Sequence, residues 1–539
     1  MTVETFFANF GHLANAPNGV QKLRELILQL AVQGKLVPQD LNDESAPCLI
    51  EKLKLKPVTQ DTAYDVPSNW VWLSFSDAFD IKGGSQPPKS QFIDAPKKGY
   101  VRLLQIRDFG SKPVPVFVPE DSVSKLCAAD DIMMGRYGAS VGKVFTGQAG
   151  AYNVALVKFI FSRDLFDNLF VFNLLKSSYF QNHLADFSRS AQAGFNKGDL
   201  AKINIPLPPL EEQKRIVAKV DQLMALCDEL EARQQKQQQG RVRLNNAALD
   251  ALLTAREPIE FADHWQRISS NFDLLYDHPE TIAKLRAAIL QLAVQGKLVP
   301  QDPNDEPASV LLERIKAEKD RLVKEGKVKK QKPLPVITTD EDESTLPPGW
   351  KLVRVGDLGE TQTGTTPPRC NKENVGDFIP FIGPGDIRNY NIDYSGQGLS
   401  EKGLANGRLI QEGSVMMVCI GGSIGKHAIN DRDVSCNQQI NTITPYSRDS
   451  VRYLFMAMGT ERFQEMVIGA SSGSATPIIN KQKWSSIPIP VAPEAEQRRI
   501  VAKVDQLMAL CDELETKLNQ AQQHSEKLME ATVRKLLVA

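Results

Sequence analysis

The sequence lacks the features that mark secreted, membrane and zinc-ribbon proteins. Seven cysteines are scattered over 539 residues, and no two have the CxxC spacing. An odd number of scattered thiols indicates a reduced intracellular protein rather than a disulfide framework. No apolar stretch approaches the roughly 18 residues of a membrane span, and the first residues lack the basic and apolar regions of a secretory signal. We therefore expect a soluble, cytoplasmic protein.

An excess of charge of one sign is also missing. Lys and Arg number 64 and Asp and Glu number 65, so the formal net charge is -1. Global charge therefore gives no argument for a nucleic acid or a membrane as partner. At roughly 150 residues per domain, the length predicts three or four domains.

Motifs of catalysis and of metal binding are scarce. HExxH, GxGxxG and an NPP tetrapeptide are absent, and the six histidines are scattered. We predict no catalytic residue and no metal site. GASVGK (138–143) and GGSIGK (421–426) resemble a phosphate loop, but only three residues separate the outer glycines, and no Ser or Thr follows the lysine. A nucleotide site, a plain strand–turn–strand and a turn that contacts a phosphate backbone remain open as interpretations.

Two blocks of the chain occur twice. KLRELILQLAVQGKLVPQD (22–40) returns with two differences at 284–302, and QKRIVAKVDQLMALCDELE (213–231) returns with one difference at 497–515. Such near-identity indicates a duplicated unit, and the offsets of 262 and 284 residues are too long for a solenoid. Each copy is therefore a domain with its connectors.

The segments between these blocks diverge but keep a common skeleton. PSNW (67–70) pairs with PPGW (347–350), GSQPP (84–88) with GTTPP (364–368), and Asn153 with Asn437. The second copy gains 18 residues, mostly within the lysine-rich stretch 313–332, ahead of the acidic run 340–343. Constant connectors around divergent cores indicate that scaffolding and recognition are separate functions.

The repeated blocks predict helices. Apolar residues recur at spacings of four and three, which is the seam of a coiled coil. We expect an antiparallel pair of helices, 211–239 and 494–535, and a possible break at Gly240. Gly34 and Gly296 are expected to cap the two shorter helices. The expected seam consists of Ile216, Val220, Leu223, Cys227, Leu230, Ile500, Val504, Leu507, Cys511 and Leu514.

The divergent segments predict a mixed α+β fold. Strands are expected at 100–106, 114–118, 154–161, 378–382 and 414–420, and helices within 165–187 and 450–468. The predicted division is 1–210, an N-terminal helical segment with a first α+β domain; 211–262, a helical spacer; 263–345, the repeated helix with a basic linker; 346–493, a second α+β domain; and 494–539, a C-terminal helix.

This arrangement resembles the specificity subunit of type I restriction–modification systems over essentially the whole chain. The helices with EQ–RIV–KVD–LM–LCDELE and with AILQLAVQGKLVPQD carry the resemblance, and each occurs twice in the expected order. The resemblance implies two target recognition domains, each reading one half of a bipartite DNA sequence. It also implies that the helices dock two methylation subunits, that restriction subunits join them, and that this chain is non-catalytic. S-adenosylmethionine, ATP and Mg²⁺ are then expected in the partner subunits, and no cofactor in this chain.

Base readout is expected from polar and basic side chains in loops, since Arg and Lys suit guanine and Asn and Gln suit adenine. Lys143 and Lys426 are expected to contact phosphate instead. The first-domain candidates for DNA contact are Ser85, Gln86, Lys89, Gln105, Arg107, Arg136, Tyr137, Ser140, Lys143, Asn153, Asn196 and Lys197. The second-domain candidates are Thr365, Thr366, Arg369, Arg388, Asn389, Ser423, Lys426, Asn437, Gln438, Gln439, Asn480 and Lys481.

Charge gives the DNA hypothesis mild support. From Trp70 to Ile205 there are 16 basic and 12 acidic residues, and from Trp350 to Ile489 there are 14 and 13. Two alternatives to a type I subunit remain: the recognition subunit of a fused enzyme that cuts on both sides of a bipartite site, and a coiled-coil scaffold without a nucleic-acid role.

Overall fold

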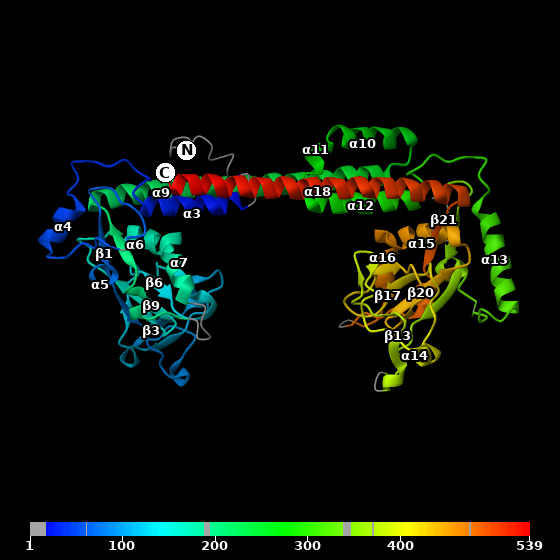
Figure 1. Cartoon of the computed structure of the whole chain (residues 1–539), viewed down its shortest axis with the longest axis horizontal. Helices are drawn as coiled ribbons and strands as arrows, with labels where there is room; N and C mark the ends of the chain where they lie inside the picture. Colours follow the sequence, from blue (N-terminus) through cyan, green and yellow to red (C-terminus); the bar gives the residue numbers. More distant parts are fainter. Residues whose placement is uncertain are drawn as a thin grey trace. The chain divides into compact units, whose positions relative to one another are not determined.

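The structure is a computed structural model that describes residues 14, 18–60, 62–187, 194–331, 333–337, 346–368, 371–473 and 476–538. The chain forms two compact units (Figure 1). Unit 1 contains Met1–Gln238 and Gln520–Ala539, and unit 2 contains Gln239–Asn519. Each unit therefore holds one sheet domain and a part of each of the two longest helices.

The sheet domain of unit 1 contains two four-stranded sheets, ordered β2-β9-β6-β7 and β4-β3-β8-β5, and a separate β1-β10 pair. Its strands are β1 (Val71–Ser74), β2 (Asp80–Gly83), β3 (Tyr100–Leu104), β4 (Phe117–Pro119), β5 (Leu126–Cys127), β6 (Met133–Gly135), β7 (Val144–Phe145), β8 (Gly150–Tyr152), β9 (Leu156–Ile160) and β10 (Asn204–Leu207). Its helices are α3 (Gly19–Val32), α4 (Ala46–Lys52), α5 (Phe75–Ala78), α6 (Asn168–Lys176), α7 (Ser178–Phe187) and α8 (Lys197–Leu200).

Unit 2 repeats this topology, because its sheet β12-β20-β17-β18 and its pair β11-β21 match β2-β9-β6-β7 and β1-β10. Its strands are β11 (Lys351–Arg354), β12 (Gly359–Thr363), β13 (Val375–Ile379), β14 (Phe381–Ile382), β15 (Ile387–Arg388), β16 (Asn391–Ile392), β17 (Val415–Val418), β18 (His427–Ile429), β19 (Ser435–Cys436), β20 (Ile440–Pro445) and β21 (Pro488–Val491). Its helices are α10 (Pro258–Ser270), α11 (Phe272–Leu275), α12 (Pro279–Val294), α13 (Ala308–Lys324), α14 (Glu401–Ala405), α15 (Val451–Met458), α16 (Glu461–Ala470) and α17 (Lys481–Ser485).

The α+β expectation is confirmed, with shifted boundaries. The helix expected within 165–187 is two helices that meet at Ser177, and the one within 450–468 is divided at Gly459 and Thr460, where Thr460 caps α16. The strand expected at 114–118 begins only at Phe117, and Pro380 separates β13 from β14 inside the strand expected at 378–382. Proline has no N–H to continue a ladder.

The two longest helices are α9 (Leu210–Thr254) and α18 (Glu494–Val538), each of 45 residues. The break suggested at Gly240 was wrong, since α9 continues through it. A glycine inside a helix costs only about 1 kcal/mol relative to alanine, which a packed helix tolerates.

The seam residues lie in the hydrophobic cores of their own units. Ile216, Val220, Leu223 and Cys227 are buried with α3 and with Met529 from the last part of α18. In unit 2 the first part of α18 packs with α12 and with Leu249 from the last part of α9. In each unit the beginning of one long helix thus shares a core with the end of the other, as in antiparallel helices. The remaining seam residues are buried in these two clusters (Ile500, Val504, Cys511) or pack against them half-buried (Leu230, Leu507, Leu514).

Each shorter repeated helix ends at a glycine against which a tryptophan side chain packs. Gly34 and Gly296 have φ values of 70° and 67°, as expected of the caps. A Cβ atom on either glycine would lie 3.1 Å from Cζ2 of Trp70 or of Trp350. The repeated proline–tryptophan motifs are therefore the points at which the sheet domains pack onto these helices.

A buried glutamate at the start of each long helix completes this contact. Trp70 Nε1 donates to Glu212 at 3.0 Å, and Trp350 Nε1 donates to Glu496 at 2.9 Å. Glu212 also accepts a hydrogen bond from Gln39 at 2.8 Å. Burial raises the pKa of both glutamates, and the tryptophan donors partly offset this effect.

Candidate nucleic-acid interface

The GASVGK and GGSIGK segments are tight turns, each held by a hydrogen bond from a glutamine side chain. Gly138 and Gly142 have positive φ values, as do Gly421 and Gly425. Gln181 Nε2 on α7 donates to Gly142 O at 2.9 Å, and Gln464 Nε2 on α16 donates to Gly425 O at 3.1 Å. A Cβ atom on Gly142 would lie 2.4 Å from Gln181 Oε1. The backbone angles of these glycines are ones that other residues rarely adopt, and a Cβ on Gly142 would also displace the Gln181 side chain.

These turns have neither the geometry of a phosphate loop nor that of a hydrolase nucleophile. Both motifs place the turn between a strand and a helix. Here the first turn joins β6 to β7, and the second joins β17 to β18. The nucleotide-binding interpretation loses its structural basis, although the spacing Gly138–Ser140–Gly142 also fits GxSxG.

In unit 1 the candidate residues converge through backbone hydrogen bonds between loops. Ser85 N donates to Tyr152 O at 3.0 Å, and Asn153 N donates to Leu104 O at 3.1 Å, next to Gln105. Arg136 N donates to Ala155 O at 2.8 Å. The loops that carry Ser85, Gln105, Arg136 and Asn153 are thus joined in one cluster, which we call loop cluster 1.

Unit 2 builds the same cluster with different side chains. Thr365 N donates to Cys436 O at 2.8 Å, and Asn437 N donates to Ile382 O at 3.1 Å. Cys419 N, next to the glycine turn, donates to Gln439 O at 2.7 Å. We call this set of loops loop cluster 2.

One glycine makes the close approach possible in each cluster. A Cβ atom on Gly84 would lie 2.1 Å from Asn153 O, and one on Gly364 would lie 2.1 Å from Asn437 O. No side chain fits at that distance, so the close packing of the loops requires glycine as the first residue of the GSQPP and GTTPP motifs. Their following polar residues are free to differ.

Exposure separates the candidates into groups. The exposed ones are Gln86, Lys89, Arg107, Tyr137, Lys143, Asn196, Lys197, Thr366, Arg388, Asn389, Lys426, Gln438 and Asn480. The half-buried ones are Ser85, Gln105, Arg136, Ser140, Asn153, Thr365, Ser423, Asn437, Gln439 and Lys481. Arg369 lies outside the described residues.

Four candidates make structural contacts at α8 and α17. Asn196 and Asn480 are N-caps, since their side chains accept from Asp199 N and Lys483 N. Lys197 pairs with Asp80 at 2.6 Å, and Lys481 Nζ donates to Thr361 O at 3.2 Å. Burial lowers the pKa of Lys481. These contacts hold α8 and α17 against their sheets, and DNA contact by these residues stays a prediction.

The Arg136 side chain also has contacts within the protein. Its Nε donates to Phe195 O at 2.9 Å, and its guanidinium lies 5.2 Å from the centre of the Tyr137 ring. These contacts orient the guanidinium before any ligand binds, which reduces the entropy lost on binding.

Sequence reasoning missed two residues beside loop cluster 2. Exposed Arg408 donates to Thr363 O at 2.9 Å, one residue before the GTTPP motif. Tyr390, with φ of 64° at the β15–β16 turn, is 60% exposed. No motif marked Arg408, and Tyr390 was passed over although it directly follows the candidates Arg388 and Asn389.

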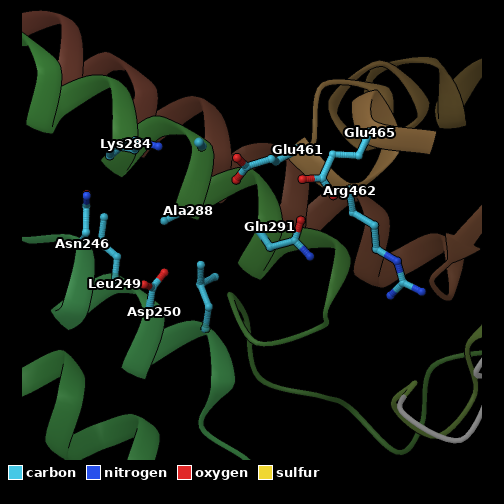
Figure 2. Close-up of a pocket in the computed structure, with 11 residues that line it drawn as sticks. Asn246, Leu249, Asp250, Lys284, Ala288, Gln291, Glu461, Arg462 and Glu465 are labelled. Carbon is cyan, nitrogen blue, oxygen red and sulfur yellow. The ribbon is translucent and has the colours of Figure 1, made fainter. Parts of the chain in front are cut away.

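A polar cavity of about 370 Å³ lies in unit 2 between the last part of α9, α12 and α16 (Figure 2). Buried Gln291 Oε1 on its wall has no hydrogen-bond partner in the described part of the chain. At the equivalent place in unit 1, Gln29 Oε1 accepts from Tyr179 N at 3.1 Å. The lining residues are Asn246, Leu249, Asp250, Leu253, Lys284, Ala287, Ala288, Gln291, Glu461, Arg462 and Glu465.

The pairing of the repeated lysine also differs between the units. Lys22 pairs with Glu530 at 3.2 Å in unit 1. Its counterpart Lys284 faces a cavity in which Asn246 takes the place of that glutamate, by the repeat offset of 284. Unit 2 therefore presents an acceptor and a cation that unit 1 satisfies internally.

The described part of the chain contains neither a metal-binding cluster nor a membrane-spanning helix. No group of three or more His, Cys, Asp or Glu side chains in that part of the chain is placed to hold a metal ion. No described helix is long and apolar enough to cross a membrane.

The two sheet domains, with their matched loop clusters, define an internally duplicated protein. Residues 67–238 and 347–522 match the family model of the type I restriction modification DNA specificity domain. The chain belongs to this family. Its members are specificity subunits rather than catalytic ones.

Curated relatives agree over nearly the whole length. The chain is 29% identical over 562 residues to the type I restriction enzyme EcoEI specificity subunit of Escherichia coli. It is 29% identical over 570 residues to the EcoAI specificity subunit of the same organism. Each alignment covers 95% of this chain and 93% of the relative.

Solved structures give weaker likenesses. A chain from a study of assembly and conformational transition in the type I restriction–modification system is 18% identical, with a TM-score of 0.49, and the match covers 88% of this chain and 99% of that one. The HsdS subunit of Thermoanaerobacter tengcongensis is 18% identical, with a TM-score of 0.42, and the match covers 89% and 99%.

Proposed function

We propose that the two sheet domains each read one half of a bipartite DNA sequence. The supporting observation is the pair of loop clusters, in which equivalent backbone hydrogen bonds hold unlike side chains. Ser85 N to Tyr152 O in one unit corresponds to Thr365 N to Cys436 O in the other. A constant frame with variable polar ends suits two different half-sites, read through base edges in the major groove.

Methylome sequencing tests this assignment directly. Cells expressing the chain with its methylation partner are compared with cells in which residues 67–209 come from a relative with another target. We expect one half of the methylated sequence to change and the other half to stay. The exchange of 347–493 is the matched control and alters only the second half. If either exchange changed both halves, or neither, the division into two readers would be wrong.

We further propose that methylation subunits dock on the helical part and supply the chemistry. S-adenosylmethionine would bind in them, and ATP and Mg²⁺ would act in restriction subunits that join the cytoplasmic complex. This chain would then contribute only the recognition of the DNA sequence.

The cavity of unit 2 is one proposed docking surface for a methylation subunit. A polar partner segment would give Gln291 Oε1 the donor it lacks and Lys284 an acidic partner. Lys284→Glu on α12 should reduce co-purification of the methylation subunit, whereas Lys98→Glu, at an exposed site in the sheet domain of unit 1, should not. Equal recovery with both variants would remove this surface from consideration.

A further inference from the structure

The insertion in the second copy lengthens a helix that is short in the first. Helix α4 has 7 residues, whereas its counterpart α13 has 17. Both helices begin in the same way. Ala46 N donates a hydrogen bond to Asn69 O, and Ala308 N donates the equivalent bond to Gly349 O. The additional residues therefore extend an existing helix, and Figure 1 shows α13 alongside the sheet domain of unit 2.

The extension is basic. Residues 316–330 contain seven Lys and Arg and three Asp and Glu, a balance of +4 in a chain of net charge -1. The second divergent domain has a balance of only +1, against +4 for the first. The insertion thus restores to the second half the positive charge that its domain lacks.

Most of the local acids are neutralised within the element. Arg321 pairs with Glu318 at 2.6 Å and with Glu325 at 2.7 Å, and Lys327 pairs with Glu325 at 2.8 Å. Asp320 is the remaining exposed acid in 316–330. Lys316, Lys324, Lys329 and Lys330 are exposed and have no acidic partner in the described part of the chain.

Both ends of the extension are held on the domain. At the start, Ala308, Leu311 and Ile315 are buried in the core. After Gly326, with φ of 70°, the chain turns back and buries Val328. Arg354, itself 7% exposed, then donates to Pro335 O at 3.2 Å and to Val336 O at 3.1 Å. The lysines therefore project from a fixed support.

We propose that α13 and the turn after it, through Lys316, Lys324, Lys329 and Lys330, form a sequence-independent arm that binds the phosphates of duplex DNA beside the second half-site. The arm rests on the proposed DNA function and adds affinity without information about bases. Lysines without an acidic partner release counterions from DNA when they bind its phosphates, whatever the base sequence. Readout of guanine or adenine would instead need donors and acceptors held in fixed positions.

The test compares three forms of the full-length chain with its co-expressed methylation subunits. They are the parent, a variant with these four lysines changed to Gln, and a control with four exposed lysines of unit 1, Lys52, Lys54, Lys56 and Lys98, changed to Gln. Binding to a labelled target duplex is measured by anisotropy between 50 and 200 mM NaCl. Each phosphate contact contributes about 0.9 to the slope of log K against log salt. With four contacts removed, we expect the arm variant to lose about 3–4 in slope, and about tenfold or more in affinity, relative to the control.

The outcomes separate the two hypotheses. A parent complex that binds no DNA overturns the proposed function itself. A parent that binds, with an arm variant of unchanged slope and affinity, overturns the arm alone, as does an equal loss in the control. If the arm variant instead loses its methylation subunits while DNA binding per complex is unchanged, the lysines bind an acidic protein surface and the arm proposal fails. Methylated target sites should be the same in all three forms.

Discussion

At the level of single residues, the sequence motifs predicted candidate loops that the structure joins by backbone hydrogen bonds, but not what each side chain does there. Asn153 and Asn437 were paired by motif alone, and the structure places both at the centre of a loop cluster. Asn196 and Asn480 were grouped with them, yet both cap helices. The sequence does not separate these roles, because an asparagine suits a cap and a base edge equally well.

Arg136 tests base readout at this scale. If its guanidinium contacts a guanine, Arg136→Ala should relax the preference at one position of the first half-site and cost about 1–3 kcal/mol of discrimination there. Methylome sequencing would measure this. Lys143→Ala is the comparison, since loss of a phosphate contact weakens all sites alike. Uniform weakening with Arg136→Ala would assign Arg136 to the backbone as well.

Glu212 tests the contact between sheet domain and helix. Glu212→Ala leaves the buried Trp70 N–H without an acceptor, which should lower the free energy of unfolding by about 1–3 kcal/mol. Glu211→Ala removes an exposed glutamate that pairs only with Lys214, so it should change stability by at most about 1 kcal/mol. Denaturant unfolding of the two variants gives the comparison. Equal effects would mean that Glu212 has no special structural role.

At the level of elements, periodicity predicted the helices well and their ends poorly. The heptad spacing from Ile216 onward predicted α9, but the expected end at residue 239 lies 15 residues before Thr254. The error came from weighing one local preference against tertiary packing that a sequence does not display. The short strands β7 and β19 were missed because a strand of two residues has no periodicity to detect.

The long helices allow a test of spacing. We expect that seven residues added after Gln238 in α9, matched by seven after Asn519 in α18, keep the seam in register and lengthen both helices by about 10 Å. If the helices set the gap between half-sites, the gap should grow by about three base pairs while both half-sites stay the same. Sequencing of methylated sites measures the gap. An unchanged gap would show that the helices do not act as a spacer.

At the level of the whole molecule, the duplication was the most informative signal in the sequence. Two repeated blocks predicted two equivalent domains, and the matching sheet orders of the two units confirm this expectation. Which base each loop reads could not be predicted, because loop cluster 1 and loop cluster 2 differ in side chains on a shared backbone frame.

The division of labour in the complex has a simple biochemical test. The purified chain alone should transfer no methyl group from S-adenosylmethionine to target DNA, and addition of the methylation subunits should restore transfer. Incorporation of labelled methyl groups is the measurement. Methylation by the isolated chain would contradict its role as a non-catalytic subunit.

The backbone bonds that join the loops of each cluster also bear on how such a protein diverges. Since Ser85 N and Thr365 N make their bonds whatever side chain they carry, replacements at these positions leave the frame intact. Mutations there, other than to proline, keep the backbone hydrogen bonds, and selection acts on them through the DNA sequence that is recognised. A descendant protein can therefore recognise a new DNA sequence while its fold stays the same.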